Sequence, residues 1–240
     1  MENSEYTYLG IASDGSFTAE NLTPGKTYEF VVRAYIEITD TTVKGNTASV
    51  KVTTKPDKVT SVKVSNLDNY GHTLTWSKAN GANYYHIYRY SSADGKYVLV
   101  AKTDKLTYTF SDLSAGKTYS YKIKSVYTKG DTQMTISDFS AVFKFATTPK
   151  KVTNLKASSV GTASVNLTWS KSSGATYYQV SVYDSAQGKY IVYGTAETNS
   201  ITVKKLKSKS TLKVKVRAVR TVGNKKYYGN YSSVLSVKTK

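Results

Sequence analysis

The stretch Leu113-Ser-Ala-Gly-Lys-Thr-Tyr119 decides the fold, because it occurs three times along the chain. The first copy is Leu22-Thr-Pro-Gly-Lys-Thr-Tyr28, and a diverged third copy is Leu206-Lys-Ser-Lys-Ser-Thr-Leu212. The second and third copies are 93 residues apart, and the same offset relates Trp76 to Trp169. This period exceeds the roughly 20–50 residues of a solenoid repeat and corresponds to a whole small domain. The sequence therefore predicts a tandem array of one domain.

Two complete copies of the domain and one partial copy are predicted. We call residues 1–55 the first unit, residues 56–148 the second unit and residues 149–240 the third unit. The first unit aligns with the second only from about Tyr97 onward, so it lacks the first three strands. Half a sandwich leaves an open apolar face and unpaired edges. Either these residues are an excerpt of a longer protein, or a strand from another chain completes the first unit.

Strands rather than helices are predicted throughout the chain. It is rich in Val, Thr and Ser and contains 22 tyrosines, and β-branched and aromatic side chains suit a pleated, half-buried surface. In Thr73-Leu-Thr-Trp-Ser77 the large apolar residues recur at period two, and Asp94-Gly95 suits a hairpin turn. This pattern gives seven strands in the second unit, the last running from Thr135 to Ala146. We expect an all-β chain of tandem antiparallel seven-stranded immunoglobulin-like sandwiches, the first one truncated.

The second and third units resemble fibronectin type III domains. Pro56, Trp76, the strand Tyr85-His-Ile-Tyr88 and the segment Leu113–Tyr119 carry this resemblance, which covers residues 56–240. Shorter patterns, such as the Gly-Lys-Tyr hairpin and the Tyr-Tyr-Gly-x-Tyr-Ser-Ser ending, resemble modules of secreted or surface proteins of Gram-positive bacteria. The resemblance implies an extracellular location, with neighbouring domains of a longer chain as partners.

The resemblance also implies structural roles for four aromatic residues. Trp76 and Trp169 would pack between the two sheets, and Tyr28 and Tyr119 would each form a corner whose hydroxyl bonds to the backbone. The third unit has Leu212 at the corner position, and its preceding turn lacks both Pro and Gly. We expect it to lose this hydrogen bond, worth about 1 kcal/mol, and to be less stable for that reason.

Catalytic and metal-binding residues are sparse. The two histidines, His72 and His86, are predicted to lie in a loop and on an exposed strand face, and there is no cysteine. The carboxylates of the second unit are scattered singly, without the spacing of a calcium loop or a glycosidase pair. No serine lies in a Gly-x-Ser-x-Gly motif. The sequence therefore predicts no enzyme, no metal and no cofactor.

Membrane insertion is not expected either. No apolar run approaches the roughly 20 residues that cross a bilayer, and the acidic residues 1–5 do not form a secretory signal. An export signal would lie outside this sequence. We also expect no specific nucleic acid partner, because no recognition motif accompanies the basic charge, and we expect a monomer.

Positive charge is concentrated in the third unit. The net charge is +18, and the third unit holds 17 Lys and Arg against Asp184 and Glu197, whereas the first unit is slightly acidic. Such a field favours anionic partners. Alternation along one strand and its neighbour predicts an outer face that bears Lys213, Lys215, Arg217, Tyr177 and Tyr183, and the predicted basic face also includes Arg220. The alternative is a solvated, edge-protecting charged face without a ligand.

Two functions follow from these features. The first is a non-catalytic spacer or adhesion array within a larger bacterial surface or secreted protein, as the tandem units and short joints indicate. The second is a binding module for a carbohydrate or an anionic cell-wall polymer, with the basic face of the third unit as its site.

Overall fold

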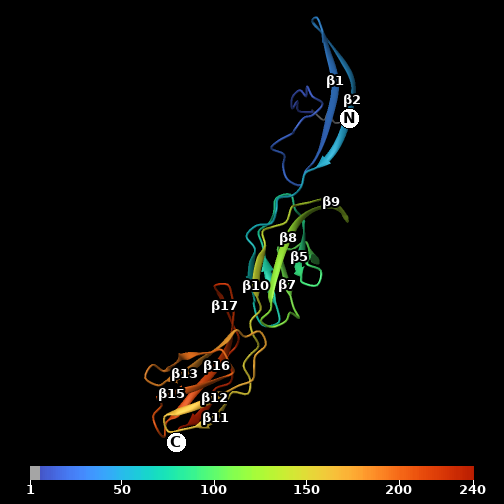
Figure 1. Cartoon of the computed structure of the whole chain (residues 1–240). Helices are drawn as coiled ribbons and strands as arrows, with labels where there is room; N and C mark the ends of the chain where they lie inside the picture. Colours follow the sequence, from blue (N-terminus) through green and yellow to red (C-terminus); the bar gives the residue numbers. More distant parts are fainter. Residues whose placement is uncertain (1–5) are drawn as a thin grey trace.

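The three units follow one another along an elongated molecule, which Figure 1 shows from the hairpin of the first unit to the C-terminus. The computed structural model describes residues 6–240, apart from the side chains of Gln133 and Met134, so the acidic stretch 1–5 lies outside the described residues. Every regular element in this part of the chain is a strand. The prediction of an all-β chain is confirmed.

The second unit is a sandwich of two antiparallel sheets. A three-stranded sheet has the order β3-β4-β7, and a larger sheet has the order β10-β8-β5-β6 with β9 also paired to β8. The bounds of the first sheet are β3 (Lys63–Ser65), β4 (His72–Thr75) and β7 (Thr107–Phe110). Those of the second are β5 (Tyr84–Ser91), β6 (Lys96–Thr103), β8 (Thr118–Lys129), β9 (Thr132–Ile136) and β10 (Phe143–Ala146).

The third unit repeats this topology strand for strand. Its sheets have the orders β11-β12-β15 and β14-β13-β16-β17, with β18 paired to β16. The smaller sheet consists of β11 (Lys156–Val160), β12 (Ser164–Thr168) and β15 (Ser200–Lys204). The larger consists of β13 (Tyr177–Asp184), β14 (Lys189–Ala196), β16 (Thr211–Val222), β17 (Lys225–Tyr228) and β18 (Leu235–Lys238).

The last strand of each sandwich is divided, whereas the sequence pattern predicted a continuous strand from Thr135 to Ala146. Between β9 and β10 the hydroxyls of Ser137 and Ser140 accept hydrogen bonds of 3.0 and 2.9 Å from backbone N–H groups of β8. Ser232 does the same for β16 at 3.0 Å. Serine side chains thus satisfy amides of the central strand where the edge strand leaves the ladder. Each sandwich retains its seven strands, the last in two pieces.

Each sandwich is built around one tryptophan, as predicted. Trp76 and Trp169 are buried, and each ring meets a buried tyrosine edge-on. The ring centroids lie 5.5 Å apart for Trp76 and Tyr85 and 5.3 Å apart for Trp169 and Tyr178. Aromatic pairs in this geometry add about 0.5–1.5 kcal/mol beyond the area that they bury.

The two predicted tyrosine corners are present. The hydroxyl of Tyr28 accepts a hydrogen bond from the backbone N–H of Thr23 at 2.8 Å, and that of Tyr119 accepts one from Ser114 at 2.9 Å. Leu212 occupies the equivalent place in the third unit and is buried. The side chain of leucine cannot accept a hydrogen bond, so Leu212 contributes packing to that corner but not the hydrogen bond that Tyr119 makes.

Tyr119→Phe is expected to lower the free energy of unfolding of the second unit by about 1 kcal/mol, because Ser114 loses its acceptor. Urea unfolding followed by amide hydrogen exchange in each unit measures the change. Tyr90→Phe is the control, since Tyr90 is 46% exposed. Equal losses in the two variants would contradict a stabilising role for the corner bond.

The first unit is a two-stranded hairpin of β1 (Thr27–Ile38) and β2 (Thr41–Thr53). In the second unit β6 pairs with β5, and β7 pairs with β4. Among residues 6–55 there is no counterpart of β4 or β5, so residues 6–26 have no ladder to join and form no strand. Val32, which is equivalent to the fully buried Ile123, is 66% exposed. The unit boundaries and the reason for the incomplete first unit stay predictions.

Both histidines are less exposed than predicted. His72 begins β4 and is buried, since the alternation that points Leu74 and Trp76 inward extends back to it. Its ring lies 4.4 Å from Phe145 and 5.3 Å from Phe110. Burial, with a smaller contribution from Arg89, lowers the pKa of His72 to about 4.

His86 lies on the outer face of β5, as strand parity predicted, but it is only 7% exposed. It sits on the central part of the sheet in register with Lys102 and Lys124, and Tyr84 lies beside it. Burial and then these two lysines lower the pKa of His86. The prediction of two exposed histidines was wrong, because strand parity says which face a residue takes and not how far its neighbours cover it.

Candidate functional surfaces: a basic ladder and two joints

The described part of the chain offers surfaces rather than a cleft. Within residues 6–240 there is no group of three His, Cys, Asp or Glu side chains placed to hold a metal ion. Nor does that range contain a helix long and apolar enough to cross a membrane. Two shallow hollows, of about 250 and 330 Å³, lie at opposite ends of the second unit. The candidate sites are therefore the basic face of the third unit and the contacts between units.

The predicted basic face forms on β16. This strand lies inside its sheet, between β13 on one side and β17 and β18 on the other. Val214 and Val216 are fully buried, while Lys213, Lys215 and Arg217 point to the opposite face. The ladder with β13 places Ser181 opposite Lys215, and the Arg217 Nε donates a 2.8 Å hydrogen bond to the Gln179 Oε1.

The cations of this face lie over tyrosine rings. The Lys215 Nζ is 4.1 Å from the ring centroid of Tyr190 and 4.3 Å from that of Tyr231. The Arg217 Cζ is 4.0 Å from the centroid of Tyr228 and 4.7 Å from that of Tyr231. Each such contact contributes about 0.5–1 kcal/mol at an exposed site.

A third cation extends this row, since the Lys213 Nζ lies 5.7 Å from the centroid of Tyr183. We call the whole row the basic ladder. It consists of Lys213, Lys215, Arg217, Tyr183, Tyr190, Tyr228 and Tyr231.

Three rings of the ladder were missed by strand parity on β13 and β16. Tyr190 comes from β14, Tyr228 ends β17, and Tyr231 lies in the segment before β18. The Gly188-Lys-Tyr190 hairpin and the Tyr227-Tyr-Gly-Asn-Tyr-Ser-Ser233 ending were visible as repeated patterns and could have identified them. Tyr177 shares the parity of Gln179 but lies opposite Val219, beyond the cations of the ladder.

Arg220 does not belong to the predicted face. It differs by an odd number of residues from Arg217, and the pairing of β16 with its neighbours shows no bulge between them. Its side chain therefore takes the parity of Val214 and Val216, and its Nε atom is buried. Including Arg220 in the predicted face was wrong, because strand parity places its side chain on the opposite side of the sheet.

The second unit carries a shorter version of the ladder. The Lys122 Nζ lies 4.5 Å from the centroid of Tyr97, and the Lys124 Nζ lies 4.4 Å from that of Phe139. Lys122 and Lys124 are the counterparts of Lys215 and Arg217 at the 93-residue offset. The ladder is thus a structural feature of both sandwiches, and the third unit adds Lys213 where the second has Ser120.

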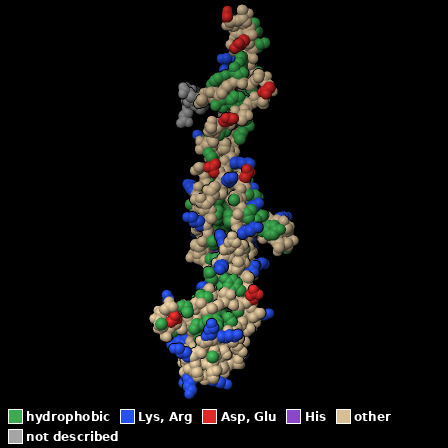
Figure 2. All heavy atoms as spheres, turned by 60° about the vertical axis from the view of Figure 1, so that its left-hand side comes forward, with side chains coloured by type: hydrophobic (Ala, Val, Ile, Leu, Met, Phe, Trp, Pro, Cys, Tyr) green, Lys and Arg blue, Asp and Glu red, His purple; other side chains and the backbone are tan. Residues whose placement is uncertain are grey.

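Few carboxylates oppose the charge of the ladder. Asp184 accepts hydrogen bonds from Ala186 and Gln187 of its own turn, and the Gln187 backbone bond is the main cause of its lowered pKa. The ion pairs found among residues 6–240 are Lys51–Glu29 and Lys55–Asp138, outside the third unit. In Figure 2 acidic side chains are most frequent at the end of the first unit, and basic ones are scattered over the units below it. The third unit therefore presents a positive surface.

The second candidate surface is the joint between units, where two glycines meet. At the joint of the first and second units a Cβ atom on Gly25 would lie 2.2 Å from the Gly81 carbonyl oxygen. At the joint of the second and third units a Cβ on Gly116 would lie 2.2 Å from the Gly174 Cα. These distances are far below any permitted contact, so only glycine fits. Both joints pair a glycine of the repeated Leu-x-x-Gly-Lys-Thr-Tyr segment with a glycine of the next unit.

A threonine just before each linker hydrogen-bonds to the Leu-x-x-Gly-Lys-Thr-Tyr segment that carries the joint glycine. The Thr147 hydroxyl donates to the Ser114 carbonyl at 2.6 Å and accepts from the Lys117 N–H at 3.1 Å. Thr54 makes the equivalent pair of bonds with Thr23 and Lys26 in the first unit. The linker therefore leaves each unit from a fixed position.

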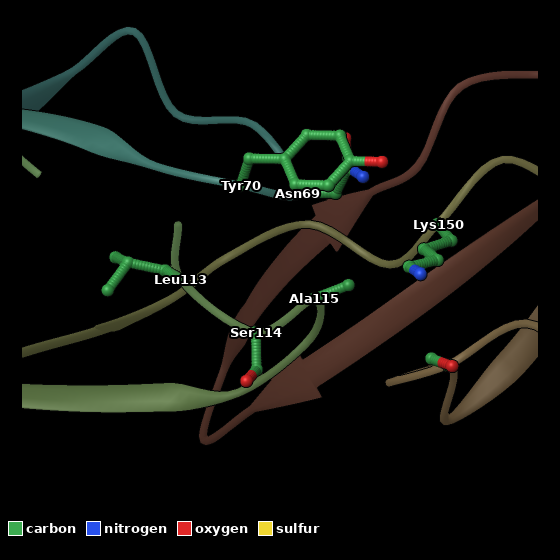
Figure 3. A pocket seen from close by; sticks show the side chains of 7 residues that line it. Asn69, Tyr70, Leu113, Ser114, Ala115 and Lys150 are labelled. Atoms are coloured by element: carbon green, nitrogen blue, oxygen red, sulfur yellow. The ribbon is translucent and has the colours of Figure 1, made fainter. Parts of the chain in front are cut away.

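The joint between the second and third units has further contacts. Tyr227 lies on β17, the strand of the third unit that reaches toward the second unit in Figure 1, and it is buried in the hydrophobic cluster of the second unit. The Ser172 hydroxyl donates a 2.6 Å hydrogen bond to the carbonyl of Lys150 in the linker. Figure 3 shows the remaining hollow beside the joint, with Tyr70, Ala115 and Lys150 around it. The hollow is open and shallow, and it lies next to the paired glycines.

Comparison with known proteins matches these two sandwiches to one family. The family described as Fibronectin type III domain matches residues 57–138 and 150–234. Exoglucanase B of Cellulomonas fimi is 29% identical to the chain over 98% of its length, which corresponds to 22% of that protein. Receptor-type tyrosine-protein phosphatase eta of Gallus gallus is 30% identical over 62% of the chain and 10% of that protein. The chain thus spans a minor part of both relatives.

Solved structures that are similar to parts of the chain include a segment of two fibronectin type III domains from chicken tenascin. It is 18% identical with a TM-score of 0.48, and the match covers 77% of this chain and 99% of the segment. A second structure, FN3tt, is 29% identical with a TM-score of 0.33 and covers 39% of this chain and 95% of its own.

Proposed function

The chain belongs to the fibronectin type III family, and from this premise we propose that it is a non-catalytic spacer within a larger extracellular bacterial protein. The observation that carries the proposal is the pair of matching glycine joints, which hold successive units end to end without a long linker. The similarity to a bacterial exoglucanase supports the bacterial setting. In this proposal the partners of the chain are the neighbouring domains of its own polypeptide, and its activity is to hold them apart.

Small-angle X-ray scattering of the chain at low and at physiological salt tests the spacer. Two sandwiches of about 30–35 Å and a hairpin of about 40 Å, at about 3.3 Å per residue, give a particle about 100–110 Å long. The spacer proposal requires this length at both salt concentrations. A compact particle, in which the units fold back on one another, would refute it.

The basic ladder supports a second candidate function, recognition of an anionic glycan or cell-wall polymer. Lysine and arginine held over tyrosine rings that are exposed (Tyr183, Tyr228) or half-buried (Tyr190, Tyr231) offer charge for a phosphate or sulfate group and an aromatic surface for a sugar ring. The third unit provides three such cations with few opposing carboxylates. Adhesion would then be added to spacing in the same chain.

Lys215→Glu combined with Arg217→Glu is expected to abolish binding to a sulfated glycan or a polyol-phosphate polymer, because two attractive charges become repulsive. Isothermal titration calorimetry of the full chain, at low salt and at about 0.15 M salt, measures the dissociation constant for each polymer. The matched control is Lys122→Glu with Lys124→Glu, at the equivalent positions of the second unit. If the variant with Lys215→Glu and Arg217→Glu bound as tightly as the parent, this candidate function would be refuted. It would also be refuted if the parent lost all binding to polyanions at about 0.15 M salt.

A further inference from the structure

The end of the third unit differs from the ends of the first two at the residue that makes the joint. At the 93-residue offset, Gly116 of the second unit corresponds to Lys209 of the third. Both have a positive φ, +61° for Gly116 and +51° for Lys209. Lysine rarely adopts this conformation, because its Cβ meets the following carbonyl oxygen there. The loop of the third unit thus keeps the backbone shape that glycine has at the joints.

Hydrogen bonds confirm that the two loops are equivalent. The N–H of Gly116 donates to the carbonyl of Thr148 at 3.0 Å, and the N–H of Lys209 donates to that of Lys240 at 3.2 Å. The Thr239 hydroxyl donates to Lys207 at 2.7 Å and accepts from Ser210 at 2.9 Å, as Thr147 does in the second unit. The loop and its threonine contact are therefore conserved between the units, and the side chain at residue 209 is the difference that matters for packing.

From these observations we propose that the loop that carries Gly25 or Gly116, at the end of a unit, is a docking surface specific for the turn that carries Gly81 or Gly174 in the next unit. We further propose that Lys209, at the equivalent position, prevents such docking on the third unit. The partner that fits is a sandwich with the turn Gly-Ala-x-Tyr-Tyr, present at Gly81–Tyr85 and Gly174–Tyr178. At Gly25 and Gly116 even a Cβ atom would overlap the backbone of that turn. Lys209 has the backbone conformation of Gly116 but carries a Cβ and a long side chain from that position, so a unit attached after the third is joined by a hinge.

This inference rests on the proposed spacer function, and it adds a rule for where the spacer bends. A glycine at this position gives a fixed joint, and a side chain gives a mobile one. The basic ladder lies on the third unit, whose end carries Lys209 and therefore forms a mobile joint in this proposal.

The first experiment installs the third unit's residue in the second unit. Gly116→Lys is made in the full chain with spin labels at Ala93→Cys and Ala186→Cys, two exposed positions on equivalent turns. The chain has no native cysteine, so only these positions take a label. Electron–electron double resonance should show one narrow distance peak for the parent and its loss in Gly116→Lys. The control Gly130→Lys, with φ +58° and nothing within 4 Å of its Cβ, should keep the peak.

The second experiment attaches a copy of residues 56–148 after Lys240. Labels at Ala186→Cys and at the added copy's equivalent of Ala93 should give a broad distribution with Lys209 present. Lys209→Gly should produce a narrow peak. A narrow peak with Lys209 in place, or a broad distribution that Lys209→Gly leaves unchanged, would overturn the inference. A broad parent distribution between the second and third units would instead refute the fixed spacer, so the two failures are distinguishable.

Discussion

Trp169→Ala is expected to destabilise the third unit by about 3–5 kcal/mol, the largest loss that a single substitution should cause here. Trp169 is 3% exposed and meets Tyr178 edge-on at 5.3 Å, so alanine would leave a cavity between the sheets and remove the aromatic contact. A domain of this size has only about 5–15 kcal/mol of stability in total. Urea unfolding, followed by hydrogen exchange resolved by unit, measures the change.

The matched control for this substitution is Trp76→Ala, which should destabilise the second unit and leave the third unchanged. Trp169→Ala should shift the unfolding of the third unit, and Trp76→Ala that of the second. An equal shift of both units in either variant would contradict two separate cores and would indicate one cooperative body joined through Tyr227.

His72→Val is expected to make the second unit resistant to acid. The pKa of His72 is about 4 in the folded state, against an ordinary value of 6.5, so between these values the unfolded chain binds more protons. Stability from the neutral ring is complete above about pH 6.5 and is lost as the pH falls toward 4. Allowing for partial screening by solvent, the loss is about 2–3 kcal/mol. Valine is the residue that the third unit has at the equivalent position, Val165, which is fully buried.

Urea unfolding of the second unit at pH 7, 5 and 4 tests this effect. The parent should lose about 2–3 kcal/mol more than His72→Val over that range, since the other titrating groups are common to both proteins. His86, whose pKa is also lowered, remains in both. Parallel stability curves for the parent and the variant would show that His72 does not control the acid sensitivity.

Repetition made most of the fold predictable from the sequence. Strand alternation depends on local spacing and predicted the strands, and the resemblance to fibronectin type III domains implied the roles of Trp76, Trp169 and the tyrosine corners. The division of the last strand was not predictable by alternation, because serine hydroxyls replace backbone partners there. The burial of His72 could have been predicted by extending the period of Leu74 and Trp76 backward by one step.

The candidate surfaces were predictable only in part. Strand parity placed Lys213, Lys215 and Arg217 correctly with Tyr183, but it could not find rings contributed by other elements, such as Tyr190 and Tyr231. The glycine joints depend on contacts between units, and a single glycine in a sequence does not reveal what approaches it. Only the structure shows that Gly81 faces Gly25 and that Gly174 faces Gly116.

The most direct test of the spacer is whether the second and third units move as one body. Residual dipolar couplings of the full chain, measured for backbone N–H groups in one aligned medium, give an alignment tensor for each sandwich. A fixed Gly116–Gly174 joint predicts that one tensor fits both units in the orientation of Figure 1. Two tensors of different magnitude or orientation would mean that the units turn independently, and the spacer account would then be wrong.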